Sequence, residues 1–144
     1  NQKHETTAPW GSGITKVIIE EGVTSIGDYA FYFCTMLADV IIPDSVINIG
    51  TCAFADCIAI TQVDMPENLT NIEEWAFAGT GIVSITIPAN VTTIGDAVFL
   101  GCNNLTSIEF KGTISQWNEI VKGSWWNDNT GNFTVHCTNG TTYK

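Results

Sequence analysis

The stretch VTSIGDYAFYFC (Val23–Cys34) decides the fold, because its parts return along the chain. The next copy reads INIGTCAFADC (Ile47–Cys57), and altered copies begin at Asn71 and Thr93. Aligned on these copies, several apolar columns keep a spacing of 22 or 23 residues. Two of these columns consist of Phe31, Phe54, Phe77 and Phe99, and of Ile26, Ile49, Ile72 and Ile94. Repeats of this length are typical of a solenoid.

Each unit predicts one short strand and a returning turn. The segment VSITI (Val83–Ile87) alternates in the β-branched manner of a strand. A proline follows in three copies and ends the pairing, because proline has no N–H to donate. Asp28, Thr51 and Asp96 stand two residues before the A-F position, where each could cap a short helical turn. One unit cannot bury its own apolar edge, but stacked units bury each other's.

The predicted fold class is therefore a solenoid with a parallel β-sheet of about five to six short strands on one face. Short helical or irregular turns are expected on the other face. We divide the chain into an N-terminal tail and cap (1–13), repeats of about 23 residues (14–110) and a C-terminal cap (111–144). Trp10 should lie as a lid on the first coil. Within the C-terminal cap, ISQWNEIV (Ile114–Val121) has helical spacing and FTVHC (Phe133–Cys137) predicts the final strand.

Composition excludes several classes of partner. The 144 residues suffice for one domain. They include 15 acidic residues against five lysines and no arginine, for a formal charge of −10. This charge repels nucleic acid and anionic lipid. No apolar run reaches the roughly 18 residues of a membrane span, so we expect no membrane insertion.

No arrangement of side chains predicts catalysis, a metal site or a cofactor. The two histidines, His4 and His136, have no catalytic partner in the sequence, and no phosphate-binding or metalloprotease motif occurs. Asp39 and Asp64 could form a carboxylate pair for acid–base chemistry or calcium, but their spacing is unspecific. The odd count of five cysteines favours buried thiols, with one disulfide as the alternative.

A candidate protein-binding face follows from strand alternation, because side chains between the buried positions point outward. Its members are Lys16, Ile18, Asp39, Ile41, Gln62, Asp64, Ser84, Thr86, Ser107 and Glu109. Together they should form one continuous face on the order of 20 Å long. The alternative is that they are simply the solvated side of a sheet, with Ile18 and Ile41 beneath the N-terminal segment.

The units IIPDSVINIGTCAFADC (41–57) and TIPANVTTIGDAVFLGC (86–102) resemble BspA-like leucine-rich repeats. The segment from Phe110 to Gly140 resembles the terminal segment that often closes such arrays. This resemblance covers nearly the whole chain and implies a leucine-rich repeat solenoid from a bacterial surface or secreted protein. It also implies adhesion to a host matrix or bacterial surface protein, and it supplies no catalytic residues.

The leading hypothesis is a non-enzymatic protein-binding module, extracellular or at the cell surface, that acts as a monomer without a cofactor. One alternative is a structural spacer of the cell envelope. Another is a carbohydrate-binding module that uses exposed tryptophans near the C-terminal end, Trp125 and Trp126.

Overall fold

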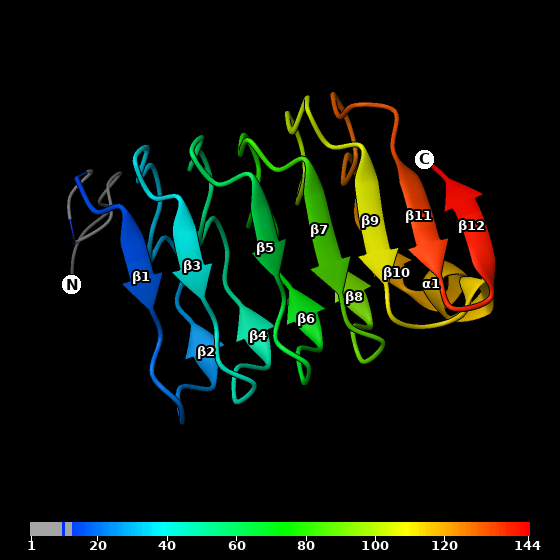
Figure 1. Cartoon of the computed structure of the whole chain (residues 1–144), viewed down its shortest axis with the longest axis horizontal. Helices are drawn as coiled ribbons and strands as arrows, with labels where there is room; N and C mark the ends of the chain where they lie inside the picture. The colour runs from blue at the N-terminus through cyan, green and yellow to red at the C-terminus, as the bar shows by residue number, and fades with distance from the viewer. Residues whose placement is uncertain (1–9, 11–12) are drawn as a thin grey trace.

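The computed structural model describes Trp10 and residues 13–144. Most of the predicted N-terminal tail, including His4, lies outside the described residues. Within them the chain winds into stacked coils, and the fold predicted from the repeat is confirmed (Figure 1).

The longer strands of the coils line one side of the molecule (Figure 1). They are β1 (Lys16–Ile18), β3 (Asp39–Ile41), β5 (Gln62–Asp64), β7 (Ser84–Ile87), β9 (Ser107–Phe110) and β11 (Thr134–Cys137). β1 pairs with β3, and β5, β7, β9 and β11 form a continuous parallel run. No strand pairing joins β3 to β5, so the sheet is interrupted at this point.

The opposite side also contains a second parallel sheet, which the sequence analysis missed. Its two-residue strands are β2 (Ser25–Ile26), β4 (Asn48–Ile49), β6 (Asn71–Ile72), β8 (Thr93–Ile94) and β10 (Val121–Lys122). All are paired in sequence order. The turns that follow are irregular, so the expected helix caps are wrong. Instead, Asp28 Oδ1 accepts from the Thr51 N–H of the next coil at 2.8 Å, and Asp96 Oδ1 likewise accepts from Ser124 N–H.

The repeated columns form the core, as predicted. Phe31 and Phe54 stack with ring centroids 5.3 Å apart, as do Phe54 and Phe77, and Phe77 stacks on Phe99 at 6.2 Å. Val23 is 37% exposed although its counterpart Val46 in the next coil is fully buried. The difference arises because no described coil covers the first one.

Left-handed backbone recurs at two positions of every turn. Tyr29, Cys52, Trp75, Ala97 and Trp125 form one column with positive φ, and Phe33, Asp56, Gly79, Gly101 and Asn129 form the other. Gly27, Gly50 and Gly95 share a column with Glu73 of the third copy and have no positive φ, so this column does not need glycine for its backbone conformation.

The C-terminal segment contains a helix and a hairpin. α1 (Ile114–Glu119) confirms the predicted helix, although it ends two residues early and Val121 is exposed. β11 is not the final strand, because β12 (Gly140–Tyr143) pairs with it in the antiparallel direction. Trp117 and Phe110 meet edge to face beneath α1, with centroids 5.3 Å apart.

The cysteines of the described chain form no disulfide. Cys57 Sγ donates to Phe31 O at 3.0 Å and Cys102 Sγ to Phe77 O at 3.1 Å. Burial raises the pKa of the Cys57 thiol to about 12. Cys57 and Cys102 therefore link coils as neutral donors. The prediction of buried thiols is confirmed for Cys34, Cys57 and Cys102, whereas Cys52 and Cys137 are only partly buried.

Candidate functional site

The ten residues predicted for the candidate face all have the expected register on the long strands. Strand pairing places them in two rows, each of which is interrupted between β3 and β5. The first row contains Lys16, Asp39, Gln62, Ser84 and Ser107, and the second contains Ile18, Ile41, Asp64, Thr86 and Glu109. β11 extends the rows with Thr134 beside Ser107 and His136 beside Glu109.

The first two strands carry the apolar part of this face. Ile18 and Ile41 are neighbours in register and are 63% and 51% exposed. The alternative that they lie beneath the N-terminal segment concerns residues 1–9, 11 and 12, which lie outside the described residues. Large exposed aliphatic side chains that touch each other are a feature of protein contact sites.

The face is divided by the break between β3 and β5, which corrects the expectation of one continuous surface. A groove with a volume of about 630 Å³ lies at this break, lined by residues of both halves. Asp39 and Gln62 lie on its opposite sides, as do Ile41 and Asp64. Apolar side chains and carboxylates therefore meet at one hollow on an otherwise flat sheet.

The polar part of the face carries three carboxylates, Asp39, Asp64 and Glu109, against one lysine. Glu109 Oε2 accepts from Ser107 Oγ at 3.0 Å, which orients the carboxylate along its own strand. Lys16 is the one basic residue among the ten, and it is the register partner of Asp39. The surface is therefore suited to a partner with positive charge.

The arrangement offers little for catalysis. His136 Nε2 lies 3.0 Å from Thr134 Oγ1, and its Nδ1 lies 3.4 Å from Thr141 Oγ1, so both ring nitrogens face hydroxyl groups. Burial raises the pKa of Cys102, which disfavours a thiolate nucleophile. The described residues contain no cluster of three His, Cys, Asp or Glu side chains able to hold a metal ion.

The two C-terminal tryptophans differ in exposure. Trp126 packs against Phe99, Trp117 and Phe133 with centroid distances between 5.9 and 6.4 Å. Trp125 is 62% exposed and lies in the left-handed column of the turns. Of the pair proposed as a carbohydrate platform, only Trp125 projects freely from the core.

Sequence reasoning missed the other exposed aromatic residues of the turns. Tyr29 and Trp75 occupy the same column as Trp125 and are 45% and 41% exposed. The signal was available, because each stands directly before the buried A-F pair of its unit. Cys52 separates them, and its side-chain hydrogen bond is the main cause of the raised pKa of Tyr29.

The family comparison covers most of the chain. A family model described as "BspA type Leucine rich repeat region (6 copies)" matches residues 9–125. No curated protein matches the sequence. No helix in the described part of the chain has the length and apolar character needed to cross a membrane.

Three solved structures share the fold. A leucine-rich repeat protein of T. pallidum is 29% identical with a TM-score of 0.72, and the match covers 85% of this chain and 57% of that one. A leucine-rich cell surface protein of Faecalibacterium prausnitzii A2-165 is 36% identical with a TM-score of 0.59. The match covers 75% of this chain and 35% of that one. A leucine-rich repeat protein of Bacteroides ovatus is 30% identical with a TM-score of 0.55. The match covers 76% of this chain and 33% of that one.

These neighbours are longer than the chain, which spans between a third and less than three fifths of their lengths. Solenoids of this kind present an extended surface that typically binds other proteins. The architecture is therefore of a protein-interaction type.

Proposed function

Because the chain belongs to the family of BspA-type leucine-rich repeat proteins, we propose that it is a non-enzymatic protein-binding module of a bacterial surface or secreted protein. Its ligand is a host matrix or bacterial surface protein, bound along the candidate face. We propose further that it acts as a monomer outside the cell, with the division into 1–13, 14–110 and 111–144 as its working parts.

The observation that carries this proposal is the exposed Ile41, which lines the groove at the β3–β5 break and has the exposed Ile18 as its register partner on β1. Apolar residues next to carboxylates, as Ile41 lies beside Asp39 and Asp64 at the groove, suit a protein contact, because burial supplies affinity and charge supplies specificity. The second row changes from isoleucine to acidic and hydroxyl side chains across this groove. A partner with an apolar residue flanked by basic ones fits this change.

The test is a double charge reversal, Asp64→Lys with Glu109→Lys. Both side chains are exposed, so the melting temperature should stay within a few degrees of wild type while binding falls. Immobilised wild-type and variant proteins would be compared for capture from matrix and mucosal extracts. We expect bands that the wild type retains and the variant loses at least tenfold.

The control is Glu119→Lys, which makes one charge reversal of the same kind on α1, away from the face. It should keep the captured bands. Equal capture by all three proteins would contradict the proposal and favour a spacer. If Trp125→Ala alone abolished binding to a glycan array, the carbohydrate alternative would replace it.

A further inference from the structure

The turns that follow the short strands enclose a further hollow, away from the candidate face. Its volume is about 370 Å³, within the range of about 300–1,000 Å³ that small-molecule sites occupy. Tyr29 and Tyr32 line it from the first coil, and Trp75 lines it from the third. The second coil, between them, contributes the short side chains of Cys52 and Ala55. The hollow is therefore a pocket with aromatic walls in the side of the stack.

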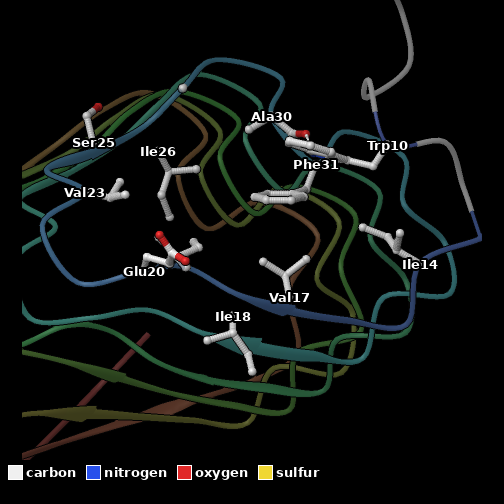
Figure 2. Close-up of a pocket in the computed structure, with 12 residues that line it drawn as sticks. Trp10, Ile14, Val17, Ile18, Glu20, Val23, Ser25, Ile26, Ala30 and Phe31 are labelled. Atoms are coloured by element: carbon white, nitrogen blue, oxygen red, sulfur yellow. Dashed lines mark hydrogen bonds between the residues drawn. The ribbon is translucent and has the colours of Figure 1, made fainter.

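This hollow lies among the described coils. The outer side of the first coil is where the Trp10 ring stacks on the Phe31 ring, with centroids 5.8 Å apart (Figure 2). The hollow lies on the other side of that coil, because its remaining lining residues, such as Asp56, Trp75 and Leu100, belong to the next three coils. Its floor in the second and third coils consequently has a described coil on either side.

The two aromatic walls stand two coils apart. Tyr29, Cys52 and Trp75 occupy one position of three successive turns, with φ values of 60°, 56° and 62°. Paired strands of neighbouring coils lie about 5 Å apart, so equivalent backbone atoms of Tyr29 and Trp75 are about 10 Å apart. The 5.3 Å between the ring centroids of Phe31 and Phe54 agrees with this spacing. A group held midway is then about 5 Å from each wall, within the roughly 6 Å at which cations interact with aromatic faces.

The charge at the hollow is negative. Among the described residues that line it, only Asp56 is charged. A Cβ on Gly79 would collide with Asp56 Oδ1, so this carboxylate lies against the glycine of the next coil, which also lines the hollow. Burial raises the pKa of the Cys52 thiol, and three nearby carboxylates raise it further. They belong to Glu74, Asp28 and Asp56. The hollow is therefore suited to a cationic ligand.

The lining determines which kind of cation fits. A primary ammonium or a guanidinium needs an acceptor for each N–H, and burying it without acceptors is costly. Apart from the Asp56 carboxylate, the hollow presents mainly aromatic rings and the apolar side chains of Ala55, Ala78 and Leu100. A trimethylammonium group has no N–H, presents methyl groups to an apolar surface and is attracted by aromatic faces. A cation of this type matches both the lining and the charge.

We infer that this hollow binds the trimethylammonium group of a choline-type compound. The group lies between Tyr29 and Trp75, its methyl groups contact Ala55 and Ala78, and Asp56 supplies the opposite charge. This site is separate from the candidate face and does not depend on the proposed protein ligand.

The probe is choline, titrated into the full chain at constant ionic strength and followed by saturation transfer to its methyl protons in NMR. The decisive comparison is 3,3-dimethyl-1-butanol, which has the shape of choline without its charge. It should bind at least tenfold more weakly than choline. Failure of choline to bind, or equal binding of the two compounds, would overturn the inference.

Two further compounds distinguish the sources of the group. Phosphocholine and glycine betaine carry the same trimethylammonium group beside an anion, which the carboxylates of the hollow repel. Both should bind more weakly than choline, and tighter binding of either would contradict the role of these carboxylates. Binding of cellobiose at the hollow in place of choline would assign it to a carbohydrate and refute the inference.

Trp75 provides the test of the aromatic wall. Trp75→Ala should weaken choline binding at least tenfold. Trp125→Ala is the matched control, because Trp125 occupies the same column, is 62% exposed and does not line the hollow, and it should bind within twofold of wild type. Trp75→Phe keeps an aromatic face and should bind within fivefold of wild type, whereas Trp75→Leu keeps only apolar bulk and should lose as much as Trp75→Ala. Equal binding by Trp75→Phe and Trp75→Leu would refute the contact between cation and ring.

Asp56→Asn tests the charge separately. It should weaken choline binding at least threefold and leave the binding of 3,3-dimethyl-1-butanol unchanged, a difference that a general loss of structure would not produce. Asp64→Asn, which makes the same change on the candidate face, should alter neither. Equal weakening of the charged and the neutral compound by Asp56→Asn would contradict the assigned role of its carboxylate.

Discussion

Gly50 and Gly27 hold the same place in successive coils but meet different surroundings. A Cβ built on Gly50 would lie 2.5 Å from Asp28 Oδ1 and 2.8 Å from Asp28 N and Ile26 O. A Cβ on Gly27 would meet nothing within 4 Å. Both have ordinary φ, so glycine is needed at Gly50 for the close approach of two coils and not for its backbone conformation.

The contrast between Gly50 and Gly27 predicts how an added methyl group at each position changes stability. Gly50→Ala should lower the free energy of unfolding by about 1–3 kcal/mol, because the added atom meets backbone that must shift. Gly27→Ala should be neutral or stabilise by up to about 1 kcal/mol, because it only restricts the unfolded chain. Urea unfolding of both variants measures the difference. Equal effects would show that the coils do not approach each other at Gly50.

The two columns with left-handed backbone could not be predicted from the sequence. The glycine column that contains Gly27 has ordinary φ, whereas Tyr29, Cys52 and Trp75 have positive φ. Such conformations are set by the inter-coil hydrogen bonds of the turn, as between Tyr29 N–H and Thr51 O at 2.8 Å. The residues at this column differ in type from one coil to the next. Their identities therefore give no sign in the sequence that the backbone there has positive φ.

At the scale of elements, the sequence predicted those with a clear apolar periodicity. The strands β5, β7 and β9 follow from alternating β-branched residues, and α1 from its apolar spacing. The two-residue strands of the second sheet are too short to alternate, so only the stacking of coils reveals them. β12 consists mainly of small and polar residues and forms because it pairs with β11 across a tight turn.

The helix α1 depends on its cap. Thr113 Oγ1 accepts from Gln116 N–H at 3.1 Å, and Gln116 Oε1 accepts from Thr113 N–H at 2.8 Å. Thr113→Ala breaks this reciprocal pair and should cost about 1 kcal/mol of stability in thermal or urea unfolding. Ser115→Ala, at an exposed position of the same helix, should change stability by less than about 0.5 kcal/mol. A larger loss for Ser115→Ala than for Thr113→Ala would contradict the capping role.

At the scale of the whole molecule, one rule explains both proposed surfaces. Among the described residues, each inner coil is covered by its neighbours, so the surfaces left for contact include the outward rows of the long strands and the exposed side chains of the turns. The rows were predictable, because alternation alone selects residues such as Asp64 and Glu109. The groove between β3 and β5 was not, because the residues on either side keep the repeat pattern while their backbones stay unpaired.

The register of the rows can be measured directly with engineered disulfides, in a chain where Cys52 and Cys137 are replaced by serine. Ser84 and Ser107 are register partners on adjacent strands, so their Cα atoms lie about 5 Å apart, within reach of a disulfide. Ser84 and Glu109 are offset by two residues and lie about 8 Å apart, which is too far. Mass spectrometry after mild oxidation should show near-complete cross-linking of Ser84→Cys with Ser107→Cys, and almost none of Ser84→Cys with Glu109→Cys. The reverse order would show that the coils do not stack in the register on which both proposed surfaces depend.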